Sequence, residues 1–330
     1  MLTEVRDEAA FAELTERYRG ELRVHCYRML GSFDESEDMV QETFLRAWRR
    51  RESFEGRATF RSWLYRIATN ACLDFLGSHA RRVRPYDVPP MVGPDVPVEA
   101  PTQIPWLQPF PDRLLAAGEA EPEAAAVAKE TIELAFLAAI QHLPPKQRAV
   151  LILRDVLGWS ANETSEALDM SVASVKSALQ RARPALQERL PRRRLDWAPA
   201  TDPTAEERTL LQRYMAAAEH AAPDEWAQLM SEDIRITMPP NPLWFAGREP
   251  LVAYLAQMFD PASPLYIGDW RHLPTRANRQ PAAAAYVRRP GTTVFRAQVL
   301  DVLHVEGGRI VAVTAFEPHL FPAFGLPLTL

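Results

Sequence analysis

A helix with one basic face is predicted for "SVASVKSALQRAR", residues 171–183. Its apolar residues recur at helical spacing, so they form one stripe that is expected to be buried. The opposite face carries hydroxyls, an amide and cations, and it carries no acid. Cations suit phosphates, and hydroxyl, amide and guanidinium groups can reach base edges, so this face predicts contact with DNA. The residues assigned to this contact are Ser171, Ser174, Lys176, Ser177, Gln180, Arg181 and Arg183.

The segment before this helix predicts how the basic face is positioned. Ser160 stands three residues before Glu163 in a capping-box pattern, so a first helix is expected over residues 161–168. The sequence "DMS" then makes a tight turn, and Ser171 caps the second helix. Two short helices joined so closely predict a helix-turn-helix, whose second helix enters the major groove of DNA.

The composition limits where a nucleic-acid surface can lie. The chain has 330 residues, of which 47% are hydrophobic and 25% charged, and its formal net charge is −5. A basic surface must therefore be local rather than general. No apolar run approaches the roughly 20 residues that span a bilayer, and the start "MLTEVRDEAAF" is acidic. We therefore expect a cytoplasmic protein with no membrane partner.

The two cysteines do not indicate a metal site. Cys26 and Cys72 lie in helix-like segments and lack the spacing of a zinc site. They are interpreted as reduced thiols of the core. We expect no metal and no cofactor.

The sequence pattern divides the chain into three folded parts and a long connection. Helical patterns occupy residues 1–77 and return in residues 123–194, while residues 78–122 are rich in proline. From residue 205 to 330, two amphipathic helices precede strand-like runs separated by turns, which predicts an α+β domain with an antiparallel meander. The predicted strands are "WRHLPTRA", "AAAAYVRR", "TTVFRAQVLDVLHV" and "RIVAVTAF".

The proline-rich connection contains apolar residues that a merely solvated linker would not need. Ile104, Trp106, Leu107 and Phe110 alternate with its prolines. Two interpretations stay open: a loop that packs on its own domain, and a segment that docks on a partner.

The run "LPPKQRAVLILRDVLGWSANETSEALDMSVASVKSALQRAR" resembles region 4 of the extracytoplasmic-function (ECF) sigma factors, the module that binds the promoter −35 element. The resemblance assigns the basic face of residues 171–183 to that element. Three residues depart from the family pattern. Asp169 replaces a frequent glycine but tolerates the left-handed turn conformation. Ala178 replaces a frequent arginine, and Pro184 is expected to bend or stop the helix near Arg183.

The first helical part resembles region 2 of the same family. "SFDESEDMVQETFLRAW" is similar to region 2.2, which docks on the coiled coil of the β′ clamp of RNA polymerase. A solvated acidic face is the alternative for this segment alone. "RRRESFEGRATFRSWLYRIATNACLDFL" resembles regions 2.3 and 2.4, which melt the −10 element; its Phe60 and Trp63 are expected in the core rather than stacked on bases. The implied polymerase-binding residues are Asp38, Gln41, Glu42 and Leu45, and the implied −10 residues are Arg57, Arg61, Arg66 and Asn70.

The third part resembles the SnoaL-like, nuclear-transport-factor-like cone fold, with a curved antiparallel sheet. Fused to a sigma factor, it implies a domain that regulates in cis. The same fold hosts enzymes, so three interpretations are kept: cone packing, a binding pocket without chemistry, and catalysis. The candidate pocket residues are Trp244, Tyr254, Trp270, His272, Tyr286 and Asp301.

The resemblance as a whole implies a multidomain ECF sigma factor that is not an enzyme. Its expected partners are core RNA polymerase, through the β′ clamp and the β flap, promoter DNA, and an unidentified small-molecule or protein effector of the third domain. The linker is expected to thread toward the polymerase channels through "IPWLQPFPD". The cone, with or without the tail "FPAFGLPLTL", is expected to pack on region 2, region 4 or both and restrain them, or else to support the active complex. Rival interpretations are a stand-alone helix-turn-helix regulator and an enzyme fused to a DNA-binding module.

Overall fold

The computed structural model describes residues 7–56, 59–79, 106–115, 132–190 and 202–330, without the side chains of residues 242 and 243. Two units are distinguished by their internal contacts. Residues 1–84 and 113–200 make the first unit, and residues 85–112 and 201–330 make the second. Each unit is described by itself below.

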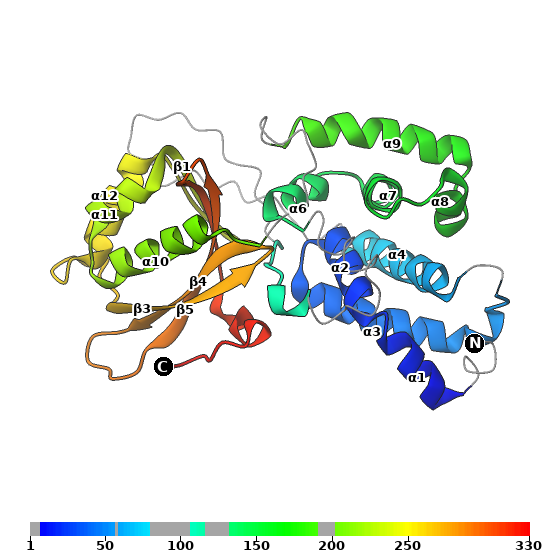
Figure 1. Ribbon diagram of the computed structural model, residues 1–330, viewed down its shortest axis with the longest axis horizontal. Helices are drawn as coiled ribbons and strands as arrows, with labels where there is room; N and C mark the ends of the chain where they lie inside the picture. The colour runs from blue at the N-terminus through cyan, green and yellow to red at the C-terminus, as the bar shows by residue number, and fades with distance from the viewer. Residues whose placement is uncertain (1–6, 57–58, 80–105, 116–131, 191–201) are drawn as a thin grey trace. The chain divides into compact units, whose positions relative to one another are not determined.

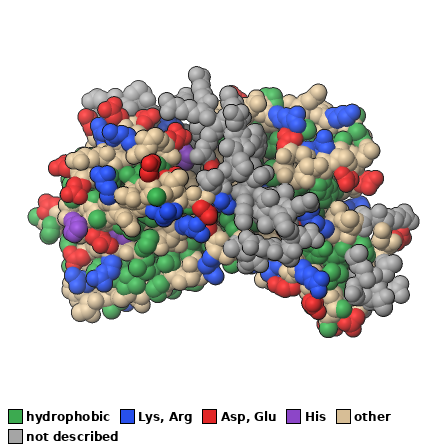
Figure 2. Space-filling view, in the orientation of Figure 1, with side chains coloured by type: hydrophobic (Ala, Val, Ile, Leu, Met, Phe, Trp, Pro, Cys, Tyr) green, Lys and Arg blue, Asp and Glu red, His purple; other side chains and the backbone are tan. Residues whose placement is uncertain are grey.

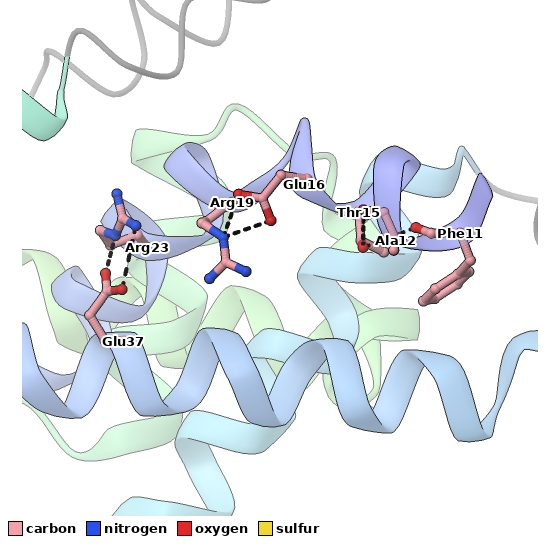
Figure 3. Close-up of polar contacts among 7 residues, drawn as sticks. All are labelled: Phe11, Ala12, Thr15, Glu16, Arg19, Arg23 and Glu37. Carbon is pink, nitrogen blue, oxygen red and sulfur yellow. Dashed lines mark hydrogen bonds and ion pairs between the residues drawn. The ribbon is translucent and has the colours of Figure 1, made fainter. Parts of the chain in front are cut away.

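The first unit begins with a group of helices held together by an aromatic and aliphatic core (Figure 1). Helix α2 ends at Gly31, whose left-handed φ of 73° a side chain would strain. Ser32 then caps α3, since its side chain accepts the amide of Glu35. Arg23 of α2 forms an ion pair with Glu37 of α3, as Figure 3 shows, so the two helices are joined by charge as well as by their core. The elements are α1 (Glu8–Glu16), α2 (Arg19–Leu30), α3 (Phe33–Arg49), the 3-10 turn η2 (Arg51–Ser53) and α4 (Phe60–His79).

The second helical group of this unit contains the predicted helix-turn-helix. The capping box between Ser160 and Glu163 is present, and Asp169 adopts the left-handed conformation with φ 50°, so both predictions are confirmed. Of the two outcomes expected at Pro184, a bend or a stop near Arg183, the stop is wrong, because the helix continues to Gln187. The fixed φ of proline is compatible with a helix, and the carbonyl that loses its partner belongs to Gln180, which is an exposed residue. The elements are α6 (Leu134–Gln141), α7 (Pro145–Leu151), the π-helical turn η5 (Ile152–Val156), α8 (Ala161–Leu168) and α9 (Val172–Gln187).

The second unit is built on a six-stranded sheet with strand order β2-β1-β6-β5-β4-β3. Neighbouring strands are antiparallel except β1 and β6, which are parallel, so the sheet is mixed rather than wholly antiparallel as expected. Strands β1 and β2 lie outside the meander that the sequence predicted. The strands are β1 (Met230–Met238), β2 (Asn241–Ala246), β3 (Asp269–Ala277), β4 (Gln280–Arg288), β5 (Arg296–Glu306) and β6 (Arg309–Phe316).

Three helices lie on one face of this sheet (Figure 1). They are α10 (Ala205–Glu219), α11 (Pro223–Leu229) and α12 (Arg248–Phe259). Their apolar residues and those of the facing strands form the core cluster of the unit. No helix among the described residues is long and apolar enough to cross a membrane.

The C-terminal tail belongs to the same unit. The 3-10 helix η6 (Pro318–Phe324) buries Phe321 against Tyr286, with ring centroids 5.3 Å apart. The backbone of Leu330 then pairs with that of Phe295, and the carbonyl of Leu328 accepts from Ala297. The tail thus completes its own domain, which the sequence did not predict.

Two short turns lie outside these elements. The 3-10 turn η3 spans Asp112–Leu114, and a tight turn at Asn278 and Arg279 joins β3 to β4.

Candidate functional sites

Helix α9 presents the predicted DNA-reading residues to solvent. Lys176, Gln180 and Arg181 are exposed, whereas the apolar stripe is buried. Ser171 caps the helix by accepting the amide of Ser174. Lys and Arg side chains are visible over α9 in Figure 2, with acidic side chains nearby.

One cation of this face differs from the others. Arg183 forms a bidentate ion pair with Asp155 of η5, with N–O distances of 2.8 and 2.9 Å. Lys176 and Arg181 make no ion pair within the described part of the chain. Two of the three cations are therefore available to phosphates without first losing a partner.

The predicted polymerase face of α3 is partly apolar. Asp38 and Gln41 are exposed, and Leu45 on the same helix is 52% exposed. Glu42 instead binds Arg46 at 2.6 Å, and Arg46 also binds Asp74 of α4 at 2.6 Å. Leu45 thus adds one exposed apolar side chain to an otherwise polar face.

The predicted −10 residues lie in different environments. Arg57 lies outside the described residues. Arg61 of α4 binds Glu21 of α2 at 2.7 Å, so its charge is already paired, whereas Arg66 is exposed. The side-chain amide of Asn70 donates from Nδ2 to the backbone carbonyl of Ala167 in α8, at 3.3 Å. Asn70 therefore lies where the two helical groups of the first unit meet.

A buried arginine also joins these two groups. Arg148 of α7 is 3% exposed, and it donates to the carbonyls of Ile140, Gln141 and Leu143 and to that of Met29 at the end of α2. Burial lowers the pKa of its guanidinium to about 10, where it is still charged at neutral pH. The sequence analysis missed this residue, because a single arginine in "PPKQRAV" looks like a surface residue.

A segment of the proline-rich connection is held by the sheet of the second unit. The amide of Phe110 donates to Oδ1 of Asn278 at 2.7 Å, and the amide of Asn278 donates back to the carbonyl of Phe110 at 3.0 Å. Asp112 accepts the amide of Arg279 at 2.8 Å. Pro111 forms a β-bridge with Ala277. Residues 110–112 therefore add a short strand segment to the β3–β4 hairpin.

The burial of this segment has an electrostatic consequence. Phe110 is fully buried, and burial raises the pKa of Asp112 to about 6. Arg276 and Arg279 lie near Asp112 and also pair with Asp202. The sequence left open whether the connection packs on its own domain or docks on a partner. In the structure, its residues 110–112 pack on their own chain.

A pocket of about 630 Å³ lies between the helices and the concave face of the sheet in the second unit. Tyr254, Trp270, His272 and Asp301 line it. Trp244 and Tyr286, which the sequence analysis had added, do not. Side chains alternate between the two faces of a strand, so Phe245, next to Trp244 on β2, lines the pocket instead. On β5, Val299 lines the pocket near Tyr286, at the bulge between Ala285 and Tyr286. The hydroxyl of Tyr286 instead donates to the carbonyl of Pro327.

The polar end of the pocket is formed by side chains from three elements. Asp301 of β5 is 8% exposed and accepts the hydroxyl of Tyr214, from α10, at 3.0 Å. Burial raises the pKa of Asp301 to about 7. His272 of β3 has its Nδ1 3.5 Å from Glu219, and burial lowers its pKa to about 4. No group of three potential metal ligands occurs within the described residues.

Comparison with known proteins identifies the chain. Family models match Sigma-70 region 2 over residues 14–82, Sigma-70 region 4 over residues 133–186 and a SnoaL-like domain over residues 211–313. The ECF RNA polymerase sigma factor SigG of Mycobacterium tuberculosis (strain ATCC 25618 / H37Rv) is 41% identical over 319 residues, which are 96% of this chain and 84% of that protein. This chain belongs to the ECF sigma factors.

Two further proteins are similar to different shares of this chain. The ECF RNA polymerase sigma factor SigW of Bacillus subtilis (strain 168) is 35% identical over 188 residues, 56% of this chain and 90% of that protein. The crystal structure of the Mycobacterium tuberculosis sigma factor SigJ has the same fold, with a TM-score of 0.59 and 21% identity over 96% of this chain and 99% of that one. The predicted family and fold class are confirmed. This ECF sigma factor directs transcription by RNA polymerase and carries a fused SnoaL-like domain.

The functional groups that the sequence analysis missed share one property. Tyr214, Arg148, Asn278 and Asp112 each act through a partner that is distant in sequence. A signal existed only at Asn278, which belongs to the turn sequence "RANRQ" between two predicted strands.

Proposed function

We propose that this sigma factor reads the −35 element with α9 and docks on the β′ clamp through the α3 face formed by Asp38, Gln41, Glu42 and Leu45. The residues around α4 contact the melted −10 element, and region 4 contacts the β flap. The protein acts in the cytoplasm and catalyses no reaction. The exposure of Lys176 and Arg181, and that of Leu45, supports the two surfaces.

The SnoaL-like domain regulates the sigma factor in cis by holding the connection between regions 2 and 4. The reciprocal hydrogen bonds between Phe110 and Asn278 are the observation that carries this proposal. A connection held at residues 110–112 has less freedom than a solvated one, so the domain limits how far the two sigma regions can separate.

The contacts of the first unit explain why separation matters. Asn70, which is assigned to the −10 element, donates to Ala167 of α8, and Arg148 joins α7 to α2. Asn70 is then available to DNA only after region 4 moves away from α4. An activating signal therefore has to favour the separated state over the packed one, by its difference in affinity for the two.

The experiment is a glycine substitution that frees the connection without breaking the hairpin. Asn278 has φ 55°, which glycine adopts at no steric cost, so Asn278→Gly removes the acceptor for Phe110 and retains the turn. We expect run-off transcription with core polymerase to rise several-fold and residues 106–112 to exchange amide hydrogens faster.

The matched control makes the opposite substitution, glycine to asparagine, in the next hairpin. Gly307 has φ 57° and no atom within 4 Å of an added Cβ, so Gly307→Asn should change neither transcription nor exchange. Faster exchange in residues 106–112 of Asn278→Gly with unchanged or lower transcription would contradict restraint by the domain.

A further inference from the structure

Strand β4 of the SnoaL-like domain carries very small side chains between β3 and β5, two of the strands that line the cavity. Strand β4 contains four consecutive alanines, Ala282 to Ala285, all fully buried. Ala285 lies between His272 and Val299 in the register, and Ala283 lies beside Asp301. The alanines themselves do not line the cavity, whereas their register partners His272, Val299 and Asp301 do.

The wall of this cavity is chiefly hydrocarbon. Aliphatic and aromatic side chains from α12, β1 and β2 and from the segment after α12 surround it. No lysine or arginine is among the lining residues, and the acidic ones are Asp301 and Glu317. The volume of about 630 Å³ lies within the roughly 300–1,000 Å³ common for small-molecule pockets. The apolar residues of the wall include Met238, Phe245, Leu255, Met258, Phe259 and Ile267.

The polar groups are concentrated on the strand and helix side of the cavity. Asp301 accepts one hydrogen bond, from Tyr214, although a carboxyl group can accept several. Trp270 Nε1 is buried and has no hydrogen-bond partner within the described residues. Its ring stacks on His272, with centroids 6.1 Å apart. A carboxyl group that lines a cavity can accept a further hydrogen bond from a molecule bound there.

We propose that this pocket binds an uncharged, mainly hydrocarbon small molecule through one hydroxyl group, which donates to Asp301. The apolar wall takes the body of the ligand, and the Tyr214–Asp301 pair fixes its orientation. An anionic ligand is disfavoured because Asp301 and Glu317 line the cavity without a cation. A cationic ligand would lose its hydration against a hydrocarbon wall.

The test uses three probes of one shape and the full-length chain. These are 2-naphthol, naphthalene and 2-naphthoate, measured by equilibrium dialysis at pH 7. We expect 2-naphthol to bind about fivefold to tenfold more tightly than naphthalene, as one hydrogen bond implies, and 2-naphthoate to bind least. Equal affinities for 2-naphthol and naphthalene, tightest binding of 2-naphthoate, or no binding of any probe would overturn the proposal.

Substitutions locate the probes in the pocket. The double variant Tyr214→Phe/Asp301→Leu replaces both hydrogen-bonding partners by apolar groups, a change that can be nearly neutral for stability. It should reduce the affinity for 2-naphthol to that for naphthalene and leave naphthalene binding unchanged. Val299→Phe fills the cavity and should weaken both probes. Tyr286→Phe removes a hydroxyl that lies outside the pocket and is the matched control.

Two outcomes of the variant series would overturn the site. One is an unchanged preference for 2-naphthol in the double variant, and the other is unchanged binding of both probes in Val299→Phe. Because binding is measured without polymerase or DNA, the result does not depend on whether the SnoaL-like domain restrains the sigma regions.

Discussion

Arg148 in the sigma unit and Asp301 in the SnoaL-like domain are both buried ionisable residues, yet their surroundings differ. Arg148 is 3% exposed and donates to four backbone carbonyls, as well as to the side chain of Gln141. Asp301 is 8% exposed, and Tyr214 is the one donor to it among the described residues. The arginine lies in packed protein, whereas the carboxyl group lines a cavity.

The difference separates two uses of a buried charge. A fully bonded charge fixes a structure, because every group around it loses a partner if it is removed. A partly bonded ionisable group beside a cavity retains capacity for a ligand. Arg148 is accordingly interpreted as a residue that holds α7 against α2, and Asp301 as a group that recognises a ligand.

Removing Arg148 should have the largest effect. Arg148→Ala leaves several buried carbonyls without donors, each costing about 1–3 kcal/mol, so the opening free energy of α2 and α7 should fall by about 5 kcal/mol. Hydrogen exchange of peptides from these two helices measures it. The control is Arg181→Ala on the exposed side of α9, which should change the opening free energy by less than about 0.5 kcal/mol. If Arg148→Ala also lowers the opening free energy by less than about 0.5 kcal/mol, Arg148 does not hold α2 and α7 together.

The ionisation of Asp301 should have an intermediate effect on stability. Burial raises its folded pKa from 3.8 to about 7, so the folded state holds a proton that the unfolded state releases. Stability should therefore fall as pH rises from about 4 to 7, by up to roughly 4 kcal/mol at about 1.4 kcal/mol per pKa unit. His272, whose folded pKa is lowered to about 4, contributes in the opposite direction between about pH 4 and 6.5.

A difference between variants isolates the carboxyl group from the histidine. Asp301→Asn cannot ionise and retains the shape of the side chain. The melting temperature of this variant minus that of the wild type should become more positive between pH 4 and pH 7, whereas the His272 contribution cancels. A difference that stays constant over this range would mean that Asp301 has an ordinary pKa.

The sequence predicted the elements whose signals are local. The capping box at Ser160, the left-handed turn at Asp169 and the amphipathic helices of the third part, α10 and α12, were predicted correctly. Strand β1 was missed although Ile234, Ile236 and Met238 alternate as in a strand; it pairs with β2, which follows directly after two prolines, and with the distant β6.

The candidate pocket could be predicted only in part. Aromatic and acidic residue types were recognisable, but the face of a strand on which each side chain lies depends on register. Trp244 was therefore placed in the pocket although its neighbour Phe245 lines it. Tyr214 and Asp301 are 87 residues apart, and no local pattern relates them.

The smallest effect should appear on the surface of α9, where the same contrast between bonded and unbonded charges recurs. Arg183 is paired with Asp155, whereas Arg181 makes no ion pair within the described residues. Arg181→Ala should therefore weaken binding to −35 duplexes and reduce the slope of log affinity against log salt by about one unit, since one phosphate contact is lost. Arg183→Ala should change the slope less, because binding a phosphate would first require this arginine to leave Asp155. Fluorescence anisotropy of labelled duplexes at several salt concentrations measures both slopes. Equal slopes in the two variants would show that the partner of a surface arginine does not decide its availability to DNA, and would confine the contrast to the protein interior.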